Sequence, residues 1–202
     1  ARHVLDGDSV YAISMTDGVL ARREGDAEAI KARQDAAKLA AEELGFEWLD
    51  GGEFPDNEMD SVSLLSVVQF IEQAKERLHP ALVYTHSPAD LNIDHRIVCE
   101  ATLTAFRPQP SESCLEIRTF ETMSATDFGH KSVTSDFSPN LYIDISATWA
   151  RKLKALRAYA NEMRPAPHTR SYEGIENLAR LRGNQVGLSF AEAFEVIRKI
   201  ER

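Results

Sequence analysis

Short apolar segments alternate with longer amphipathic segments through the first half of this 202-residue chain. The apolar segments have the length of buried strands, and the amphipathic ones repeat apolar residues at helical spacing. The expected strands are residues 10–15, 46–49 and 81–85, and the expected helices are residues 27–44, which Gly45 ends, 62–78 and about 93–106. Because strands that alternate with helices form βαβ units, we predict an α/β fold with a mainly parallel sheet.

The second half of the chain has a different order of segments. Residues 114–121 and 141–145 are expected to be strands, and residues 149–162, 172–181 and 190–200 are expected to be helices. At the other end, residues 1–7 have the pattern of the last turns of a helix that Gly7 closes, without an N-cap or a preceding strand. There is no internal repeat, low-complexity tract or linker, so residues 1–202 are predicted to form one domain.

The charge balance limits the partners of the chain. The net charge is −9 and the isoelectric point is about 5.2, which argues against nucleic acid and anionic membrane surfaces as partners. No apolar run approaches the roughly 20 residues of a membrane span, and no signal peptide is visible. The two cysteines, Cys99 and Cys114, are too few for a disulfide framework, so they are expected to be reduced thiols in a cytoplasmic protein.

Polar side chains are densest in residues 85–96, between the end of a strand and the start of a helix. The segment reads Thr-His-Ser-Pro-Ala-Asp-Leu-Asn-Ile-Asp-His-Arg. Parallel sheets bind ligands beyond the carboxyl ends of their strands, and imidazole and carboxylate are standard zinc ligands. The segment therefore indicates a mononuclear metal site. An alternative from these residues alone is that Asp94 caps the helix and His95 is a surface histidine.

Residues 83–108, with the string Asp-Leu-Asn-Ile-Asp-His-Arg, resemble the second signature of the PIG-L/LmbE deacetylases, in particular bacterial members from sugar and surface-polysaccharide pathways. Shorter matches follow in the family's order over nearly the whole chain: Thr16-Asp17-Gly18, Arg33, Pro55-Asp56-Asn57, Ser124-Ala125-Thr126, Pro167-His168 and Ala191-Glu192-Ala193-Phe194. The resemblance implies a Rossmann-like, three-layer α/β fold with helices on both faces of the sheet.

By this resemblance, His95 is the second histidine of a His-Asp-His site for Zn²⁺ or another divalent metal. The first histidine and the aspartate would come from a His-Pro-Asp-Asp-Glu motif immediately before Ala1, and an aspartate of that motif would be the general base. The implied reaction is amide hydrolysis, in which the metal polarises an N-acetyl carbonyl and activates a bound water. The substrate would be a small-molecule or a lipid- or nucleotide-linked amino sugar.

The resemblance also assigns roles to residues near the metal. Asp94 would orient a neighbouring group, Arg33 would stabilise developing charge near the substrate, and Asp56 would contact the sugar. Asn92 stands where many relatives have a histidine, and an amide cannot deliver a proton to a leaving amine. His86 is our first candidate for that acid, with bound water as the alternative.

Plainer interpretations of these residues stay open. Arg33 could be a helix-surface arginine, Asp56 a turn residue and His86 a structural histidine. His168 precedes a helix start, where it would contact the pocket or another subunit of a homo-oligomer, or belong to the capping region.

Two other classes of protein compete with the hydrolase. One is a non-catalytic carbohydrate-binding or assembly protein that keeps the fold without a complete metal site. The other is a nucleotide-binding protein, which ranks last because no Gly-x-Gly-x-x-Gly motif follows a strand.

The source gene tests the expected upstream motif directly. We expect the codons before Ala1 to encode a strand followed by His-Pro-Asp-Asp-Glu or a close variant. Reading the gene decides this. An initiator methionine directly before Ala1, without such a motif, would contradict the prediction and favour the non-catalytic class.

Overall fold

The computed structural model describes residues 1–16, 18 and 27–201, and the chain divides into two compact units. The first unit comprises Ala1–Asp56 and Ile143–Glu192, and the second comprises Asn57–Tyr142 and Ala193–Arg202. Asp17, in the expected loop after the strand at residues 10–15, lies outside the described residues.

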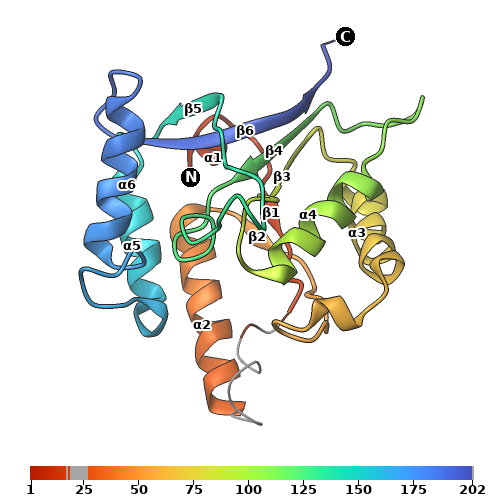
Figure 1. Ribbon diagram of the computed structural model, residues 1–202, viewed down its shortest axis with the longest axis horizontal. Coiled ribbons are helices and arrows are strands. Elements are labelled where there is room, and N and C mark those ends of the chain that lie inside the picture. Colours follow the sequence, from red (N-terminus) through yellow and green to blue (C-terminus); the bar gives the residue numbers. More distant parts are fainter. Residues whose placement is uncertain (17, 19–26, 202) are drawn as a thin grey trace. The chain divides into compact units, whose positions relative to one another are not determined.

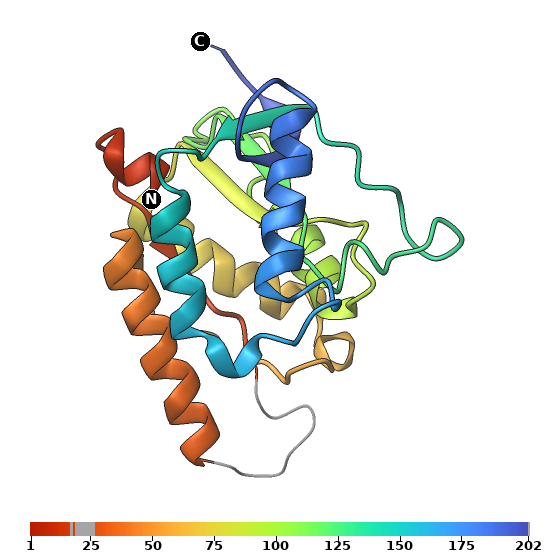
Figure 2. The ribbon, with the colours of Figure 1, turned by 90° about the vertical axis from the view of Figure 1, so that its left-hand side faces the viewer.

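The first unit is mainly helical. Its elements are α1 (Arg2–Leu5), β1 (Tyr11–Ala12), α2 (Ala27–Leu44), β2 (Glu47–Trp48), α5 (Trp149–Ala158), the 3-10 helix η3 (Ala160–Glu162) and α6 (Tyr172–Asn184). β1 and β2 pair in parallel, as the sequence predicts. α2 and α5 lie side by side (Figure 2), and Arg151 Nε donates a hydrogen bond of 2.9 Å to the carbonyl of Glu43 at the end of α2.

The core of the first unit forms around one aromatic pair. The rings of Trp149 and Phe190 are stacked, with centroids 4.6 Å apart. Ile145 and Ala179 are buried with Trp149. Burying these apolar groups supplies the hydrophobic stabilisation of this unit, at about 25 cal/mol per Å² removed from water.

Two glycines end helical segments where the sequence places them. Gly45 follows α2 with φ +82°, and Gly7 follows α1 with φ +92°. L-residues with a side chain rarely adopt this left-handed conformation. At Gly45 a Cβ would also lie 2.9 Å from Val4 Cγ1, so this position combines a conformational and a steric requirement.

The second unit carries most of the larger sheet. Its elements are the 3-10 helix η2 (Met59–Ser61), α3 (Leu64–Leu78), β3 (Leu82–His86), α4 (Ile93–Ala105) and β4 (Glu116–Phe120). The sheet order is β3-β4-β6-β5, and the unit boundaries fall within β5 (Leu141–Asp144) and β6 (Ala191–Lys199). β3 and β4 run parallel, whereas β6 pairs with β4 antiparallel. α3 and α4 pack together (Figure 1).

The prediction of a helix over residues 190–200 is wrong, because this segment forms the strand β6. Alanine, glutamate and lysine in the segment favour a helix when judged by intrinsic propensity. The antiparallel ladder with β4 instead satisfies the backbone, from Glu116 opposite Lys199 to Phe120 opposite Phe194. Ala193 and Phe194 are buried, and the Phe194 ring packs edge-on against Tyr84 at 5.1 Å. Tertiary pairing has overridden local propensity here.

The remaining elements agree with the predicted ones apart from their ends, so the α/β class is confirmed. The helix expected over residues 149–162 is shorter than predicted, because α5 ends at Ala158 and a 3-10 turn continues the chain to Glu162. Among the described residues, no helix is both long enough and apolar enough to span a bilayer.

The two cysteines are free thiols inside the second unit. Cys99 is 2% exposed and Cys114 is fully buried. Burial, followed by the charge of Asp90, raises the pKa of Cys99 to about 11. The thiolate is the reactive form of cysteine, so this environment suppresses its reactivity.

We expect neither cysteine to react with iodoacetamide in the native protein at pH 8. Both are expected to react fully once the protein is unfolded in guanidinium, which serves as the control for reagent activity. Mass spectrometry counts the labels. Rapid labelling of Cys99 under native conditions would contradict its burial.

Candidate metal centre

The expected metal segment begins at the carboxyl end of β3. In the parallel ladder, the last residue of β3, His86, lies opposite the last residue of β4, Phe120. The loops that follow both strands therefore leave the sheet at the same edge. Residues 87–92 lead from β3 into α4, whose first turn carries His95.

Three side chains of types that can bind a metal meet at this edge. The ligating atoms of His86, Asp90 and His95 all lie within 4.8 Å of one another. The rings of His86 and His95 are stacked, with centroids 3.9 Å apart and planes 11° from parallel. The predicted metal ligand and the predicted acid are thus neighbours. An imidazole lone pair lies in the plane of its ring, so two stacked rings do not point at one common ion.

Asp90 is the buried centre of the group. Its side chain is 0% exposed, and its Oδ2 lies 2.7 Å from Nδ1 of His95. Its Oδ1 accepts a hydrogen bond from the hydroxyl of Thr126, in the loop after β4. A carboxylate only accepts hydrogen bonds, so His95 carries its proton on Nδ1 and leaves Nε2 as its ligand atom. This carboxylate–histidine pair is the usual support of a metal-bound imidazole.

The environment of His86 keeps its imidazole neutral. Burial, and next the charge of His95, lowers the pKa of His86 to about 3. Its Nδ1 is buried and has no hydrogen-bond partner among the described residues, because Asp90 Oδ2 is 3.9 Å away. A neutral imidazole near pH 7 can accept a hydrogen bond or bind an ion. Its one remaining ring N–H is too weakly acidic to protonate a leaving amine efficiently, so the low pKa disfavours the predicted acid role.

The side chains of Asn92 and Asp94 accept hydrogen bonds from backbone amides and not from a histidine. Asn92 is the N-cap of α4, and its Oδ1 accepts a hydrogen bond of 2.8 Å from the amide of Asp94. The carboxylate of Asp94 accepts from the amides of Asn57 at 2.6 Å and Met59 at 3.0 Å. Asn92 Nδ2 also donates to Asn57 Oδ1 at 3.1 Å. Both residues therefore fix the loop that follows Asp56 in the sequence.

The two predicted substrate-binding residues belong to the first unit. Arg33, on α2, forms an ion pair of 2.8 Å with Glu162, and a Cβ added to Gly18 would lie 2.7 Å from its Nε. Asp56 Oδ1 accepts a hydrogen bond of 3.3 Å from the hydroxyl of Thr16. Contacts of Arg33 and Asp56 with a sugar stay predictions.

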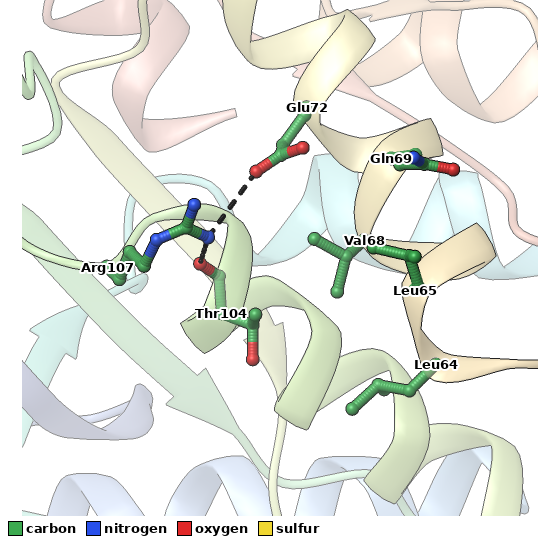
Figure 3. Close-up of a pocket in the computed structure, with 7 residues that line it drawn as sticks. All are labelled: Leu64, Leu65, Val68, Gln69, Glu72, Thr104 and Arg107. Atoms are coloured by element: carbon green, nitrogen blue, oxygen red, sulfur yellow. Dashed lines mark hydrogen bonds and ion pairs between the residues drawn. The ribbon is translucent and has the colours of Figure 1, made fainter.

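A cavity of about 280 Å³ lies elsewhere in the second unit, between α3 and the end of α4 (Figure 3). Its lining residues come from those two helices and, with Arg107, from the segment just beyond α4: Leu64, Leu65, Val68, Gln69, Glu72, Thr104 and Arg107. Arg107 is held by Glu72 at 3.6 Å and by the carbonyl of Thr104 at 3.0 Å. The cavity contains none of the predicted site residues, and its lining offers one carboxylate and no imidazole. The candidate metal centre is therefore chosen by side-chain chemistry rather than by cavity size.

Sequence reasoning assigned no role to two residues of the centre. Asp90 was part of the polar segment, and its separation of five residues from His95, across a helix N-cap, is the signal that could have paired them. Thr126 belongs to a loop after a different strand. Nothing in the local sequence connects it with Asp90.

The comparisons with known proteins identify the family of the chain. The profile of the PIG-L family, described as GlcNAc-PI de-N-acetylase, matches residues 1–106, slightly more than half of the chain. This chain belongs to the PIG-L family, which confirms the resemblance seen in the sequence. A search of curated proteins found no significant match.

Solved structures share the fold at low sequence identity. The conserved protein TT1542 from Thermus thermophilus has a TM-score of 0.76 and 19% identity, over 100% of this chain and 87% of that one. N,N'-diacetylchitobiose deacetylase from Pyrococcus horikoshii has a TM-score of 0.73 and 19% identity, over 98% and 76%. GalB, the 4-carboxy-2-hydroxymuconate hydratase of Pseudomonas putida, has a TM-score of 0.72 and 19% identity, over 100% and 90%.

The capping role of Asn92 can be tested by stability. Asn92→Ala removes the acceptor of the Asp94 amide and should lower the free energy of unfolding by about 0.5–2 kcal/mol. Asn92→Asp keeps a capping oxygen and should retain most of this stability. Urea denaturation measures both, with Ser171→Ala, which removes the N-cap of α6, as the matched control. Wild-type stability of Asn92→Ala would contradict the assignment.

Proposed function

We propose that this protein is a metal-dependent hydrolase that removes an N-acyl group, such as acetyl, from an amino sugar or a related glycoconjugate. The observation that carries the proposal is the pair formed by the buried Asp90 and the partly exposed His95, 2.7 Å apart at the carboxyl edge of β3, in a chain of the PIG-L family. The match to a family described as GlcNAc-PI de-N-acetylase supports the same class of reaction.

The donor set fits a divalent ion of the zinc type. Zinc accepts imidazole nitrogen and carboxylate oxygen, and catalytic sites leave one position for water. In this chain His95 would hold the ion through Nε2, since Asp90 already accepts the proton of Nδ1. Nδ1 of His86 is buried and has no hydrogen-bond partner among the described residues, but its ring is stacked on His95 and does not point at the same ion. The chemistry supplied by a bound ion is polarisation of the acyl carbonyl and activation of a water molecule.

The other residues of the site serve to position it. Asp94 and Asn92 fix the loop at Asn57 and Met59, and so the direction in which the chain leaves Asp56. We propose that Asp56 contacts the sugar and that Arg33 stabilises charge that develops on the acyl oxygen. The general base is proposed to come from the His-Pro-Asp-Asp-Glu motif expected upstream.

Proton delivery to the leaving amine needs a group whose proton is acidic enough to be transferred near neutral pH. The low pKa of His86 disfavours that residue as the acid. Asn92 cannot supply a proton either, because its amide oxygen caps α4 and an amide does not titrate in this range. Bound water is therefore the better candidate.

Replacement of His95 tests the proposal. His95→Ala in the full-length protein should abolish tight zinc binding and lower deacetylation by more than about 100-fold, because a ligand contributes more than the outer-shell groups that support it. The variant should stay folded but lose stability, because Oδ2 of the buried Asp90 is left without its hydrogen-bond donor. His130→Ala, an exposed histidine in the loop after β4, is the matched control and should behave as wild type.

Two measurements decide the outcome: zinc content by elemental analysis, and release of free amine from N-acetylated amino sugars. Unchanged zinc in His95→Ala would show that the ligand is misassigned. The full-length wild-type protein could instead bind an amino sugar, contain no zinc and release no free amine. That result would favour the non-catalytic carbohydrate-binding alternative.

A further inference from the structure

The loops after β3 and β4 contact each other beside His95 through a backbone hydrogen bond and a close packing contact. The amide of Leu91 donates a hydrogen bond of 3.0 Å to the carbonyl of Ala125. Gly129 packs so closely on the carbonyl of Ala89 that an added Cβ would clash with it. The loop after β4 therefore holds a defined position against the residues that flank Asp90.

The hydroxyl of Thr126 accepts one hydrogen bond and donates another, and its partners fix which is which. The amide of Thr122 lies 2.6 Å from Thr126 Oγ1 and can only donate, so the threonine oxygen accepts this bond. The single hydroxyl hydrogen is then free to point at Asp90 Oδ1, which it contacts. The hydroxyl is thus oriented by backbone on one side and by a buried carboxylate on the other.

Both oxygens of Asp90 are in use. Oδ1 accepts from Thr126 and Oδ2 from His95, and the side chain is 0% exposed. Arg96 Nη1 also fixes the backbone of this turn, with bonds of 2.8 Å and 2.7 Å to the carbonyls of Asp90 and Leu91. Because each oxygen already has a hydrogen-bond donor and the side chain is 0% exposed, the geometry favours a supporting role for Asp90 over direct metal binding. Such chains of hydrogen bonds polarise one another in a buried environment.

We propose that Thr126 is a positioning residue that acts through Asp90 to fix His95 with its proton on Nδ1 and its Nε2 presented to the metal. This inference rests on the proposed function, because it concerns the ligand of the same centre. It adds a residue from the loop after β4 that touches neither metal nor substrate. Groups that support a metal ligand in this way typically contribute about 10–100-fold to metal affinity.

The tautomer of His95 can be observed without any metal. Long-range ¹H–¹⁵N NMR spectra of the chelator-treated, full-length protein distinguish the two neutral ring forms, and His95→Gln assigns the signal of His95 among those of the other histidines. Wild type and Thr126→Ser should show the Nδ1–H form. Thr126→Val should lose it in part, because the carboxylate is free to rotate away. Thr104→Val is the matched control, since its hydroxyl donates to the carbonyl of Glu100 at 2.9 Å instead.

An amide at position 90 gives a sharper version of the same experiment. In Asp90→Asn, the Thr126 hydroxyl should hold the amide oxygen and so turn the amide nitrogen toward His95. His95 must then accept on Nδ1, and its proton moves to Nε2. In the double variant Asp90→Asn/Thr126→Val, the amide can turn over, so the Nδ1–H form should return in part. If the double variant instead loses as much of the Nδ1–H form of His95 as the two single variants lose together, the proposal is overturned.

Zinc affinity is the second readout, measured by competition with a chromophoric chelator. We expect Thr126→Val to bind zinc about 10-fold or more weakly, and Thr126→Ser to stay close to wild type. An unchanged tautomer and affinity in Thr126→Val, or a Ser variant as impaired as the Val variant, would overturn the positioning role. If wild type binds no zinc but the His95 tautomer responds as described, the proposed function fails and the positioning role stands.

Discussion

A carboxylate buried without access to water must find hydrogen-bond donors within the protein, because desolvation of an unpaired charge costs several kcal/mol. Asp90 is such a group, and its two oxygens are satisfied by His95 and Thr126. These donors come from the first turn of α4 and from the loop after β4. The need to pair one carboxylate therefore ties the helix, the strand end and the neighbouring loop into one site.

Neighbouring residues in the short segment from Asp90 to His95 have different structural roles. Asp90 faces the imidazole, Asn92 caps α4, and Asp94 holds the backbone of Asn57 and Met59. Since capping needs only a hydrogen-bond acceptor, an asparagine is sufficient at position 92. The same argument explains why this position does not have to carry a titratable group for the local structure to form.

The fold alone leaves the reaction open. The folds of a chitobiose deacetylase and a muconate hydratase are about equally similar to the fold of this chain, and each of these proteins is 19% identical to it in sequence. Function resides in the side chains that a fold presents. In the described part of the chain, the informative ones are the paired imidazole and carboxylate at the edge of β3, together with the neutral imidazole of His86.

Local signals in the sequence determined most of the elements and the place of the candidate metal centre. The spacing of apolar residues and a stop at Gly45 were enough for α2, and the polar segment at residues 85–96 marked the edge of the sheet. Only the tertiary structure decided what these signals could not. Residues 190–200 form a strand because β4 supplies partners for their backbone, and Asp90 meets Thr126 because two parallel strands end at the same edge. Both are contacts between residues far apart in the chain, which no local pattern encodes.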